Sequence, residues 1–373
     1  MIKVLFLIPN LGSGGAEKVL VNLVNHMDVD KFKITVMTLY DEGVNKTKLA
    51  KHICYRYCFK SSFFGISHIL KLFIPEKLFS RLITEKYDIV VSYLEGQTAR
   101  IIGGCKSENV KKVCWIHRTI TTMEDFSRLF RSKEEAIKCY NSFDAIVSVS
   151  KDVQRSLMRL LPLENKGIVL HNVNDSDLIL KKSTEFIDDK NLFKKNEIKI
   201  CAVGSLIPIK GFDRLISIHI KLKKQGYPIH TYILGEGREK KHLVKVISEN
   251  DVSDSITLLG YCDNPYKYMK QCDLFVCSSY SEGLSTAVTE ALILGIPVVA
   301  TNVSGMEELL GDNNEYGIVV KNNDESLFNA LAYVLSNDEI LSYYRRQAIK
   351  RGRQFETRQS VQRIERFFFS MME

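Results

Sequence analysis

The sequence predicts an α/β protein built from two doubly wound, Rossmann-like domains in tandem, with a cleft between them. The chain has 373 residues, too long for one ordinary core and long enough for two domains of about 150 to 200 residues. Apolar runs of strand length alternate with helical stretches, which is typical of a parallel sheet covered by helices on both faces. This alternation fades once near the middle of the chain and then resumes, so each half is expected to form its own sheet.

The first domain is expected at residues 1–178 and begins with the apolar run IKVLFLIP. This run resembles a short signal-peptide core, but it breaks at Asn10 and Gly12 into a turn and offers no small-residue cleavage site. We therefore interpret it as a buried first strand, followed by a helix at GAEKVLVNLVNHM and a strand at FKITVMTLY. Further strands are expected at YDIVVSYL, KKVCWIH and FDAIVSVS.

A linker is expected at residues 176–197, where periodicity is lost and charged residues accumulate. Strand and helix patterns resume with IKICAVGS and continue through IPVVATNVS, which places the second domain at residues 196–354. Beyond residue 325 only helical patterns remain. The last of them, residues 355–373, has an apolar face, and we expect this helix to pack back on the first domain.

The composition is that of a soluble globular protein, with 45% hydrophobic and 26% charged residues. No run approaches the roughly 18 apolar residues that a membrane span needs. The nine cysteines are an odd number, scattered and without a CxxC pair, so reduced thiols in the cytosol are expected. The expected location is therefore cytoplasmic, with peripheral contact to the inner face of the cell membrane as an open option.

The positive charge is concentrated in the first half of the chain. Residues 1–180 carry 26 Lys and Arg against 19 Asp and Glu, a net +7, while the remaining residues carry 26 against 25, a net +1. Such a basic half suggests an anionic partner, either a phosphorylated ligand or an acidic membrane surface, and equally fits a solvated lysine-rich surface. We do not expect a nucleic acid partner.

Six motifs follow one another along the chain: LGSGGAEK, WIHRT, VGSLIPIKGFDRLI, ILGEG, SEGLSTAVTEAL and LGIPVVATNVSGMEELL. In this order they resemble the retaining nucleotide-sugar glycosyltransferases of family four, which have the two-domain fold called GT-B. The likeness covers nearly the whole chain. It implies a hexosyltransferase that moves a sugar from a nucleotide diphosphate, a UDP-sugar above all, to an acceptor hydroxyl with retained anomeric configuration. The nucleotide sugar would be a substrate, so no cofactor is expected, and activity without a catalytic divalent ion is predicted.

The stretch SEGLSTAVTEAL predicts a phosphate site at the start of a helix. CDLFVCSS reads as a strand and STAVTEALIL as the next helix, so Gly283, Leu284, Ser285 and Thr286 form the turn at the helix N-terminus. Unpaired backbone NH groups and the positive end of the helix dipole favour an anion there. Ser285 and Thr286 can also cap the helix or donate to a phosphate oxygen.

Two carboxylates flank this turn. Glu282 precedes it and Glu290 lies about one turn inside the helix, so they are expected to clamp the ligand from two sides rather than act as a dyad. The resemblance implies that Glu282 binds hydroxyls of the donor sugar and Glu290 the ribose hydroxyls, since a carboxylate accepts two hydrogen bonds from a vicinal diol. The alternative is that Glu290 is an exposed helix residue and Glu282 a loop charge.

The loop in VGSLIPIKG supplies a cation, Lys210. The resemblance implies that Lys210 neutralises the departing diphosphate together with an Arg, but Ser205 stands where the family usually has that Arg. Ser205 can donate one hydrogen bond and carries no charge. More of the stabilisation of the leaving group is then expected from Lys210 and the helix terminus. The alternative is a surface lysine in a turn.

Glycine-rich turns follow two other predicted strands. In LGSGGAEK, the resemblance implies that Gly14 and Gly15 let the loop approach the donor phosphates and the acceptor; a plain tight turn is the alternative. Gly235 in ILGEG is expected in a strand-to-helix turn under the nucleotide. LLGYCDNP resembles the family segment whose backbone pairs with the edge of the nucleotide base, and Tyr261 is the residue expected there.

Three polar residues of the first domain follow predicted strands. His117 in WIHRT is expected at a carboxyl strand end, and the resemblance places a His near the donor sugar; a structural histidine is the alternative. Its neighbour Arg118 is a candidate phosphate or acceptor contact. Glu95 in YLEG is a candidate on the acceptor side.

No metal site is expected. The residues 175–177, DSD, mimic the Asp-x-Asp metal motif of the other glycosyltransferase fold, but they follow GIVLHNVN at the edge of the expected linker, where turn chemistry is the better interpretation. No other cluster has metal-ligand spacing.

The expected acceptor is a glycan or a lipid-linked glycan. Residues 59–83 mix apolar side chains with four cations, so they fit either a segment lying on an anionic membrane or a helix pair covering the sheet. In the first case a lipid-diphosphate-linked glycan is the natural acceptor, as in bacterial surface polysaccharide synthesis (capsule, O-antigen or exopolysaccharide).

Two alternatives stay open. An NAD-dependent oxidoreductase is favoured by GSGG after the first strand and by Asp41 after the second, and opposed by Glu17 at the third glycine position and by the second phosphate turn. A GT-B protein that is not a transferase, such as a nucleotide-sugar epimerase, is the other.

Overall fold

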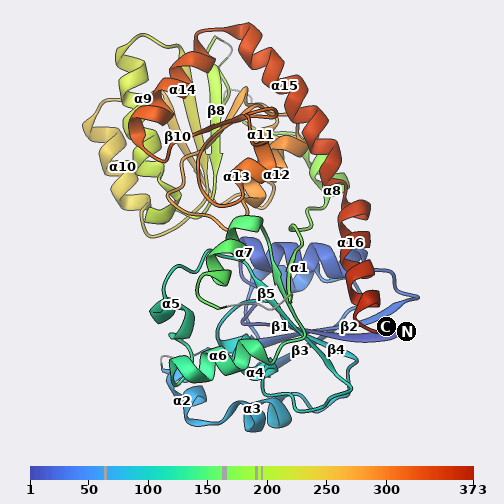
Figure 1. Ribbon diagram of the computed structural model, residues 1–373. Coiled ribbons are helices and arrows are strands. Elements are labelled where there is room, and N and C mark those ends of the chain that lie inside the picture. The colour runs from blue at the N-terminus through green and yellow to red at the C-terminus, as the bar shows by residue number, and fades with distance from the viewer. Residues whose placement is uncertain (63–64, 162–165, 190–191, 195) are drawn as a thin grey trace. The chain divides into compact units, whose positions relative to one another are not determined.

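Each half of the chain forms its own parallel β-sheet with helices on both faces, which confirms the predicted α/β fold (Figure 1). The computed structural model describes residues 1–62, 65–161, 166–189, 192–194 and 196–373. It divides into two compact units, and the first combines the two ends of the chain. Unit 1 comprises Met1–Val173 and Thr357–Glu373, and unit 2 comprises Asn174–Glu356.

The sheet of unit 1 has seven strands among the described residues, in the order β3-β2-β1-β4-β5-β6-β7, and all neighbours are parallel. Its strands are β1 (Ile2–Ile8), β2 (Phe32–Tyr40), β3 (Cys54–Phe59), β4 (Ile89–Ser92), β5 (Lys111–Ile116), β6 (Ala145–Ser148) and β7 (Gly167–Val169). The sheet extends from β1 in both directions, which is the doubly wound arrangement.

Helices connect these strands, because parallel neighbours need a crossover. They are α1 (Gly15–His26), α2 (Ile66–Leu72), α3 (Pro75–Leu82), α4 (Gln97–Ile102), α5 (Met123–Ser127), α6 (Lys133–Asn141) and α7 (Lys151–Met158), with a 3-10 turn η1 (Val44–Lys48). The basic stretch 59–83 therefore contains two short helices, α2 and α3.

The sheet of unit 2 has six strands among the described residues, in the order β10-β9-β8-β11-β12-β13, again all parallel. They are β8 (Ile198–Val203), β9 (Ile229–Leu234), β10 (Ile256–Gly260), β11 (Leu274–Cys277), β12 (Val298–Thr301) and β13 (Ile318–Val320). The chain runs outward from β8 to β10 and then returns to the other side of β8 with β11. The order therefore reverses between β8 and β11, and ligands of such sheets bind at the carboxyl ends of the strands at this switch point.

The elements around this sheet are α8 (Ser176–Ser183), η2 (Pro208–Lys210), α9 (Phe212–Lys224), α10 (Lys240–Glu249), α11 (Tyr266–Met269), α12 (Thr286–Ile293), α13 (Met306–Leu310), α14 (Asp324–Leu335), α15 (Asp338–Gly352) and η3 (Arg353–Phe355). Most of the core of unit 2 comes from aliphatic side chains of β8, β9, α9 and α14.

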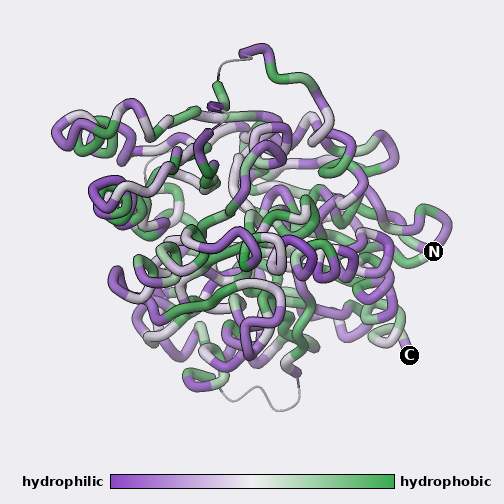
Figure 2. The backbone as a smooth tube through the Cα atoms, turned by 90° about the horizontal axis from the view of Figure 1, so that it is seen from above, coloured by the Kyte–Doolittle hydropathy of each residue, from purple (hydrophilic) through white to green (hydrophobic). Residues whose placement is uncertain are grey.

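The strands are the most apolar parts of the chain. Residues Val4 to Ile8 of β1 are fully buried, so the opening run is a core strand, as its sequence predicts. In Figure 2 hydrophobic residues gather along the inner parts of the chain trace, and many outer turns are hydrophilic. All nine cysteines are free thiols.

The segment expected as a linker contains a helix instead. Helix α8 occupies Ser176–Ser183, belongs to unit 2 and packs against α11 and α12. Asp175 caps it by accepting a hydrogen bond from the Leu178 backbone NH at 3.0 Å, and Ile179 is buried. The sequence did not predict this helix because only one short face of it is apolar and charged residues dominate the rest of 176–197.

The last helix, α16 (Thr357–Ser370), packs against the sheet of unit 1. Phe368 is fully buried and meets Phe6 and Phe32 edge to face, with ring centroids 6.0 and 6.3 Å apart. Glu365 accepts a hydrogen bond from the backbone NH of Asp28 at 2.7 Å. The apolar face of this helix is thus buried by strands encoded more than 300 residues earlier.

Candidate functional site

The predicted phosphate turn lies at the carboxyl end of β11, beside the switch point of the unit 2 sheet. Ser285 is the N-cap of α12, and its hydroxyl accepts a hydrogen bond from the Val288 backbone NH at 3.3 Å. Thr286 is the first helical residue. The strand–turn–helix arrangement predicted for Gly283 to Thr286 is therefore present, and the first backbone NH groups of α12 lie at its end.

Lys210 and Glu282 form a direct ion pair at this turn. The Lys210 ammonium lies 2.7 and 2.8 Å from the two carboxylate oxygens of Glu282. The Ser279 hydroxyl donates to the same carboxylate at 2.7 Å. Both side chains are largely buried, with exposed fractions of 27% for Lys210 and 10% for Glu282. The sequence assigned the two residues to different parts of a ligand and gave no sign that they pair with each other.

Backbone contacts join the loops that carry this pair. The Ser278 hydroxyl donates to the Lys210 carbonyl oxygen at 3.1 Å, and the Tyr280 NH donates to the Ile209 carbonyl oxygen at 2.8 Å. Gly211 follows Lys210 with a φ of +62°, and a Cβ there would lie 2.2 Å from the Ser278 carbonyl oxygen. A side chain at Gly211 would therefore separate the lysine loop from the glutamate loop.

A buried arginine that the sequence did not single out supports the same loops. Arg214, on α9, donates to the Asn322 side-chain oxygen at 2.7 Å and pairs with Asp324 at 2.8 Å. Its guanidinium lies 3.9 Å from the ring centroid of Tyr280. Asn322 in turn donates to the Tyr280 carbonyl oxygen at 3.1 Å. The signal available in the sequence was a cation on the apolar face of a helix, next to Leu215, which requires a partner.

Glu290 lies in the second turn of α12 and is only 2% exposed. The alternative that it is an exposed helix residue is therefore wrong. A buried carboxylate is costly unless other groups satisfy it, so its position reflects a specific environment rather than a solvated face.

The glycine turns that follow β8 and β9 contact each other through their backbones. Gly235 has a φ of +147°, and a Cβ there would lie 1.8 Å from the Gly204 carbonyl oxygen. Backbone hydrogen bonds run from the Leu206 NH to the Glu236 oxygen at 2.9 Å and from the Glu239 NH to the Leu206 oxygen at 3.0 Å. The turn after β8 lies so close to the turn after β9 that only glycine fits at Gly235 of ILGEG. Gly237 is equally confined, because a Cβ there would lie 2.3 Å from the Leu206 oxygen.

Ser205 and Tyr261 are exposed at the same edge of the sheet. Ser205 follows β8, and Tyr261 follows β10 with 54% of its surface exposed. Together with Lys210 and the α12 turn, these residues line the carboxyl ends of β8, β10 and β11. Gly235 follows β9 at the same edge of the sheet.

In unit 1 the structure brings Glu95, His117 and Arg118 together. The Glu95 carboxylate accepts hydrogen bonds from the His117 backbone NH at 3.2 Å and from the Arg118 Nε at 2.8 Å. Arg118 also binds Asp125, with one contact at 3.1 Å, and this hydrogen bond lowers the pKa of Asp125. Burial raises the pKa of Glu95, although Arg118 acts in the opposite direction.

His117 is a neutral imidazole. Burial lowers its pKa to about 3, and its ring lies 4.8 Å from that of Tyr93. Within the described part of the chain, its Nε2 atom is buried without a hydrogen-bond partner. A neutral ring nitrogen can donate to or accept from a ligand hydroxyl, but it cannot neutralise a phosphate charge.

A cavity of about 150 Å³ adjoins the Glu95–Arg118 pair. Its lining includes Glu95, Arg118, Asp125, Arg128 and Tyr140. It is polar, with two carboxylates and two guanidiniums, and is suited to hydroxyl-bearing ligands.

Gly14 and Gly15 lie where the first strand passes into α1. Gly14 is the N-cap and Gly15 the first residue of the helix. A Cβ on Gly14 would lie 2.2 Å from a carboxylate oxygen of Glu17, whose pKa burial raises. The missing third glycine of the dinucleotide fingerprint is thus replaced by a carboxylate that folds back over the helix start.

The described residues include neither a candidate metal centre nor a membrane-spanning helix. No group of three or more His, Cys, Asp or Glu side chains is arranged to hold a metal ion. The DSD motif contributes the N-cap of α8 through Asp175, while Asp177 is exposed on that helix. No described helix has the length and apolarity that a bilayer span requires.

Two known families match the sequence of the chain. The family described as Glycosyltransferase Family 4 matches residues 13–178, and the family described as Glycosyl transferases group 1 matches residues 183–355.

Among proteins of known activity, the chain is 30% identical over 365 residues to a Campylobacter jejuni enzyme. That enzyme is named N-acetylgalactosamine-N,N'-diacetylbacillosaminyl-diphospho-undecaprenol 4-alpha-N-acetylgalactosaminyltransferase, and the match covers 95% of this chain and 96% of the relative. An Escherichia coli O-antigen biosynthesis glycosyltransferase, WclY, is 27% identical over 195 residues, 52% of this chain and 53% of the relative.

Solved structures share the fold at low identity. The HepE protein of Anabaena, crystallised with UDP and glucose, has a TM-score of 0.80 at 20% identity, covering 99% of this chain and 100% of that one. Sucrose-phosphate synthase from Thermosynechococcus elongatus has a TM-score of 0.80 at 12% identity, covering 100% and 99%.

Proposed function

Because the chain belongs to glycosyltransferase family 4 and has the GT-B fold, we propose that it transfers a sugar from a UDP-sugar to a hydroxyl of a lipid-linked glycan, with retention of the anomeric configuration. The observation that carries this proposal is the Lys210–Glu282 pair beside the N-terminus of α12. A cation, a carboxylate and a helix start at the switch point of a parallel sheet suit a diphosphate that bears a sugar.

On the donor side, Lys210 exchanges its contact with Glu282 for the diphosphate when the donor binds. The freed Glu282 carboxylate then accepts hydrogen bonds from sugar hydroxyls, while Ser279 keeps it oriented. The α12 backbone NH groups and Lys210 neutralise the charge that develops as the diphosphate leaves, and Ser205 adds one uncharged donor. Glu290 binds the ribose hydroxyls, and Tyr261 lies beside the base.

The chemical step breaks the bond between the anomeric carbon and the diphosphate oxygen and forms one from the acceptor oxygen on the same face of the sugar. The departing phosphate oxygen takes the acceptor proton. The protein contributes positioning and charge stabilisation. His117, being neutral, serves as a hydrogen-bond partner for a hydroxyl rather than as an acid, and Glu95 with Arg118 orients the acceptor.

The acceptor class follows from the relatives and the charge. The Campylobacter jejuni relative is named for a diphospho-undecaprenol substrate, and the Escherichia coli relative for O-antigen biosynthesis. The basic first half of this chain, with a net +7 over residues 1–180, suits a diphosphate-linked lipid at an anionic surface. We therefore assign the chain to surface polysaccharide synthesis at the cytoplasmic face of a membrane.

A screen of nucleotide sugars tests the donor. The correct UDP-sugar should protect the chain against thermal unfolding, since a ligand that binds the native state stabilises it. Release of UDP should require an undecaprenol-diphosphate glycan, and turnover should persist in EDTA. Conversion of the donor without an acceptor would instead show an epimerase, and NMR of the product linkage would reveal inversion if retention is wrong.

A further inference from the structure

The connection between α2 and α3 exposes a group of large apolar side chains. Leu72 is 78% exposed, and its neighbours Ile69, Phe73 and Ile74 are 44%, 42% and 40% exposed. We call these four residues the apolar ridge. Four such residues within six positions are unusual on a soluble surface, where single exposed apolar residues are ordinary but grouped ones mark an interaction site.

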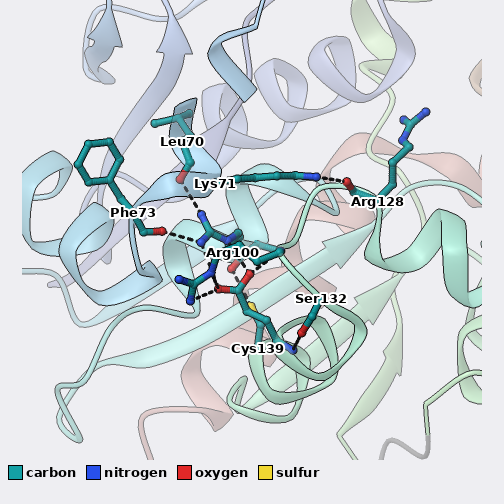
Figure 3. A network of polar contacts seen from close by, with 10 residues as sticks. Leu70, Lys71, Phe73, Arg100, Arg128, Ser132 and Cys139 are labelled. Atoms are coloured by element: carbon teal, nitrogen blue, oxygen red, sulfur yellow. Dashed lines mark hydrogen bonds and ion pairs between the residues drawn. The ribbon is translucent and has the colours of Figure 1, made fainter. Parts of the chain in front are cut away.

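A buried arginine fixes the ridge in place. Arg100, on α4, donates to the carbonyl oxygens of Leu70 at 2.9 Å and Phe73 at 2.6 Å, which lie at the carboxyl end of α2. The same guanidinium binds Glu135 of α6 at 3.0 and 3.1 Å. In Figure 3 the Phe73 ring points away from Arg100 while its carbonyl oxygen points toward it. The buried Arg100 thus pairs with the last carbonyl oxygens of α2 from the protein side, and the apolar side chains of the ridge face solvent.

A basic pocket adjoins the ridge. A cavity of about 120 Å³ is lined by Pro75 and Glu76, which directly follow Ile74, and by Lys106, Arg131 and Lys138. We call the last three residues the basic pocket. The cavity lining also includes the carboxylates Glu76 and Glu135, so the three cations leave a net charge of +1. Arg131 pairs with Glu135 at 2.7 Å and is 44% exposed. Lys106 pairs with Glu76 at 3.0 Å but is 69% exposed, so its charge remains accessible to an anion.

We propose that the apolar ridge and the basic pocket together form a docking surface for an anionic phospholipid bilayer. The ridge enters the boundary between headgroups and acyl chains, and a lipid phosphate occupies the basic pocket. An exposed apolar edge beside a cationic site is the combination that binds anionic membranes. A free phosphate would use the pocket without needing the ridge. This inference deepens the proposed function, because a membrane-bound acceptor requires the enzyme at the bilayer.

Vesicle binding tests the docking surface directly. The full chain, without donor or acceptor, is sedimented with vesicles of phosphatidylcholine alone or with about one-third phosphatidylglycerol. We expect binding to the anionic vesicles that weakens with salt. Leu72→Asp should weaken it about tenfold, from the lost apolar burial. Lys138→Gln should weaken it about fivefold, the value of one charge near an anionic surface.

Matched controls lie in unit 2. Val244 is 50% exposed on α10, and Lys245 is 70% exposed on the same helix. Val244→Asp and Lys245→Gln should bind vesicles like the unchanged chain. Equal binding to neutral and anionic vesicles, or unchanged binding by Leu72→Asp, would overturn the proposal. Vesicle binding that depends on Lys138 but not on Leu72 would indicate a phosphate site alone and would also overturn it.

A fluorescence measurement covers the case in which a charged variant folds poorly. The chain has one tryptophan, Trp115, which is buried in β5. In Phe73→Trp, the added tryptophan should shift to the blue with anionic vesicles and stay unshifted with neutral ones. No shift with anionic vesicles would contradict insertion of the ridge.

Failure of docking and failure of the proposed function are distinguishable. Transfer to a short-chain, water-soluble lipid-diphosphate glycan needs no vesicles, so Leu72→Asp should retain it. Absence of transfer to any lipid-diphosphate acceptor, with vesicle binding intact, would reject the proposed acceptor and leave the docking surface standing.

Discussion

At the scale of single residues, the candidate residues of each unit carry charges that satisfy one another before a ligand arrives. Lys210 is held by Glu282, and Arg118 by Glu95 and Asp125. Each pair keeps a costly charge oriented at a partly buried position. The donor can therefore enter the unit 2 site by replacing one partner of an existing ion pair.

Lys210→Ala should lower the turnover number by about 100-fold, because a charged hydrogen bond to the leaving group is worth about 2 to 3 kcal/mol. Steady-state kinetics with the identified donor measure this. Lys245→Ala, which removes a lysine paired with Glu249 on the exposed α10 surface, should leave turnover unchanged. Near-normal turnover in Lys210→Ala would reject the assignment of Lys210.

Arg214→Lys should weaken UDP binding about fivefold, because a lysine cannot hold Asn322 and Asp324 at once or stack on Tyr280. Calorimetric titration of UDP measures the change. Arg155→Lys changes an arginine that is 65% exposed on α7 and pairs with Asp152, where an ion pair contributes little, and serves as the control. Equal UDP affinity in Arg214→Lys and the unchanged chain would show that Arg214 does not position the site.

The buried histidines should make the protein less stable in acid. Burial lowers the pKa values of His117 and His219 to about 3, so the unfolded chain takes up their protons first and stability falls as pH drops below about 6.5. From pH 7.5 to 5.5 each should cost roughly 1 kcal/mol. Urea denaturation of His117→Gln at both pH values should show a smaller loss than that of the unchanged chain. An identical loss would show that His117 is not neutral in the folded state.

At the scale of elements, the loops at strand ends are fixed by backbone contacts that only glycine permits. Gly211 and Gly235 both have positive φ angles and lie against carbonyl oxygens of neighbouring loops. Such loops hold functional side chains in place because little freedom is left to lose on binding. The sequence motifs around these glycines therefore reflect loop-to-loop packing as well as room for a ligand.

Gly211→Ala should destabilise the protein by about 2 to 3 kcal/mol, because strained φ and a 2.2 Å approach to the Ser278 oxygen act together. Gly226→Ala is a matched control, since Gly226 has a φ of +86° but no atom within 4 Å of the added Cβ. It should cost only about 1 kcal/mol. Urea denaturation compares the two. Equal losses would show that the loop contact adds nothing to the backbone strain.

At the scale of the whole molecule, the last helix completes the core of the unit that begins the chain. Helix α16 belongs to unit 1 and buries Phe368 against Phe6 and Phe32. The chain therefore cannot complete unit 1 until its final residues are present.

Phe368→Ala should destabilise unit 1 by about 3 to 5 kcal/mol, the usual cost of deleting a buried aromatic ring. Its neighbour provides the control: Phe369 is 36% exposed, and Phe369→Ala should cost much less. Circular dichroism in urea measures both. A small, equal effect of the two substitutions would show that α16 only rests on the surface.

The sequence by itself determined the two parallel sheets, the buried first strand and the turn before α12, because apolar periodicity and glycine-bounded turns are local properties. It also indicated Lys210, Glu282 and Glu290 through a family likeness. Only the tertiary structure decided that Lys210 pairs with Glu282 and that Arg214 supports the loops that carry them. It also decided that residues 176–183 form a helix and that Arg100 holds the end of α2 from the protein side, with the apolar ridge exposed. These features join residues between about 30 and 110 positions apart or depend on one short packed face, and no local pattern encodes such contacts.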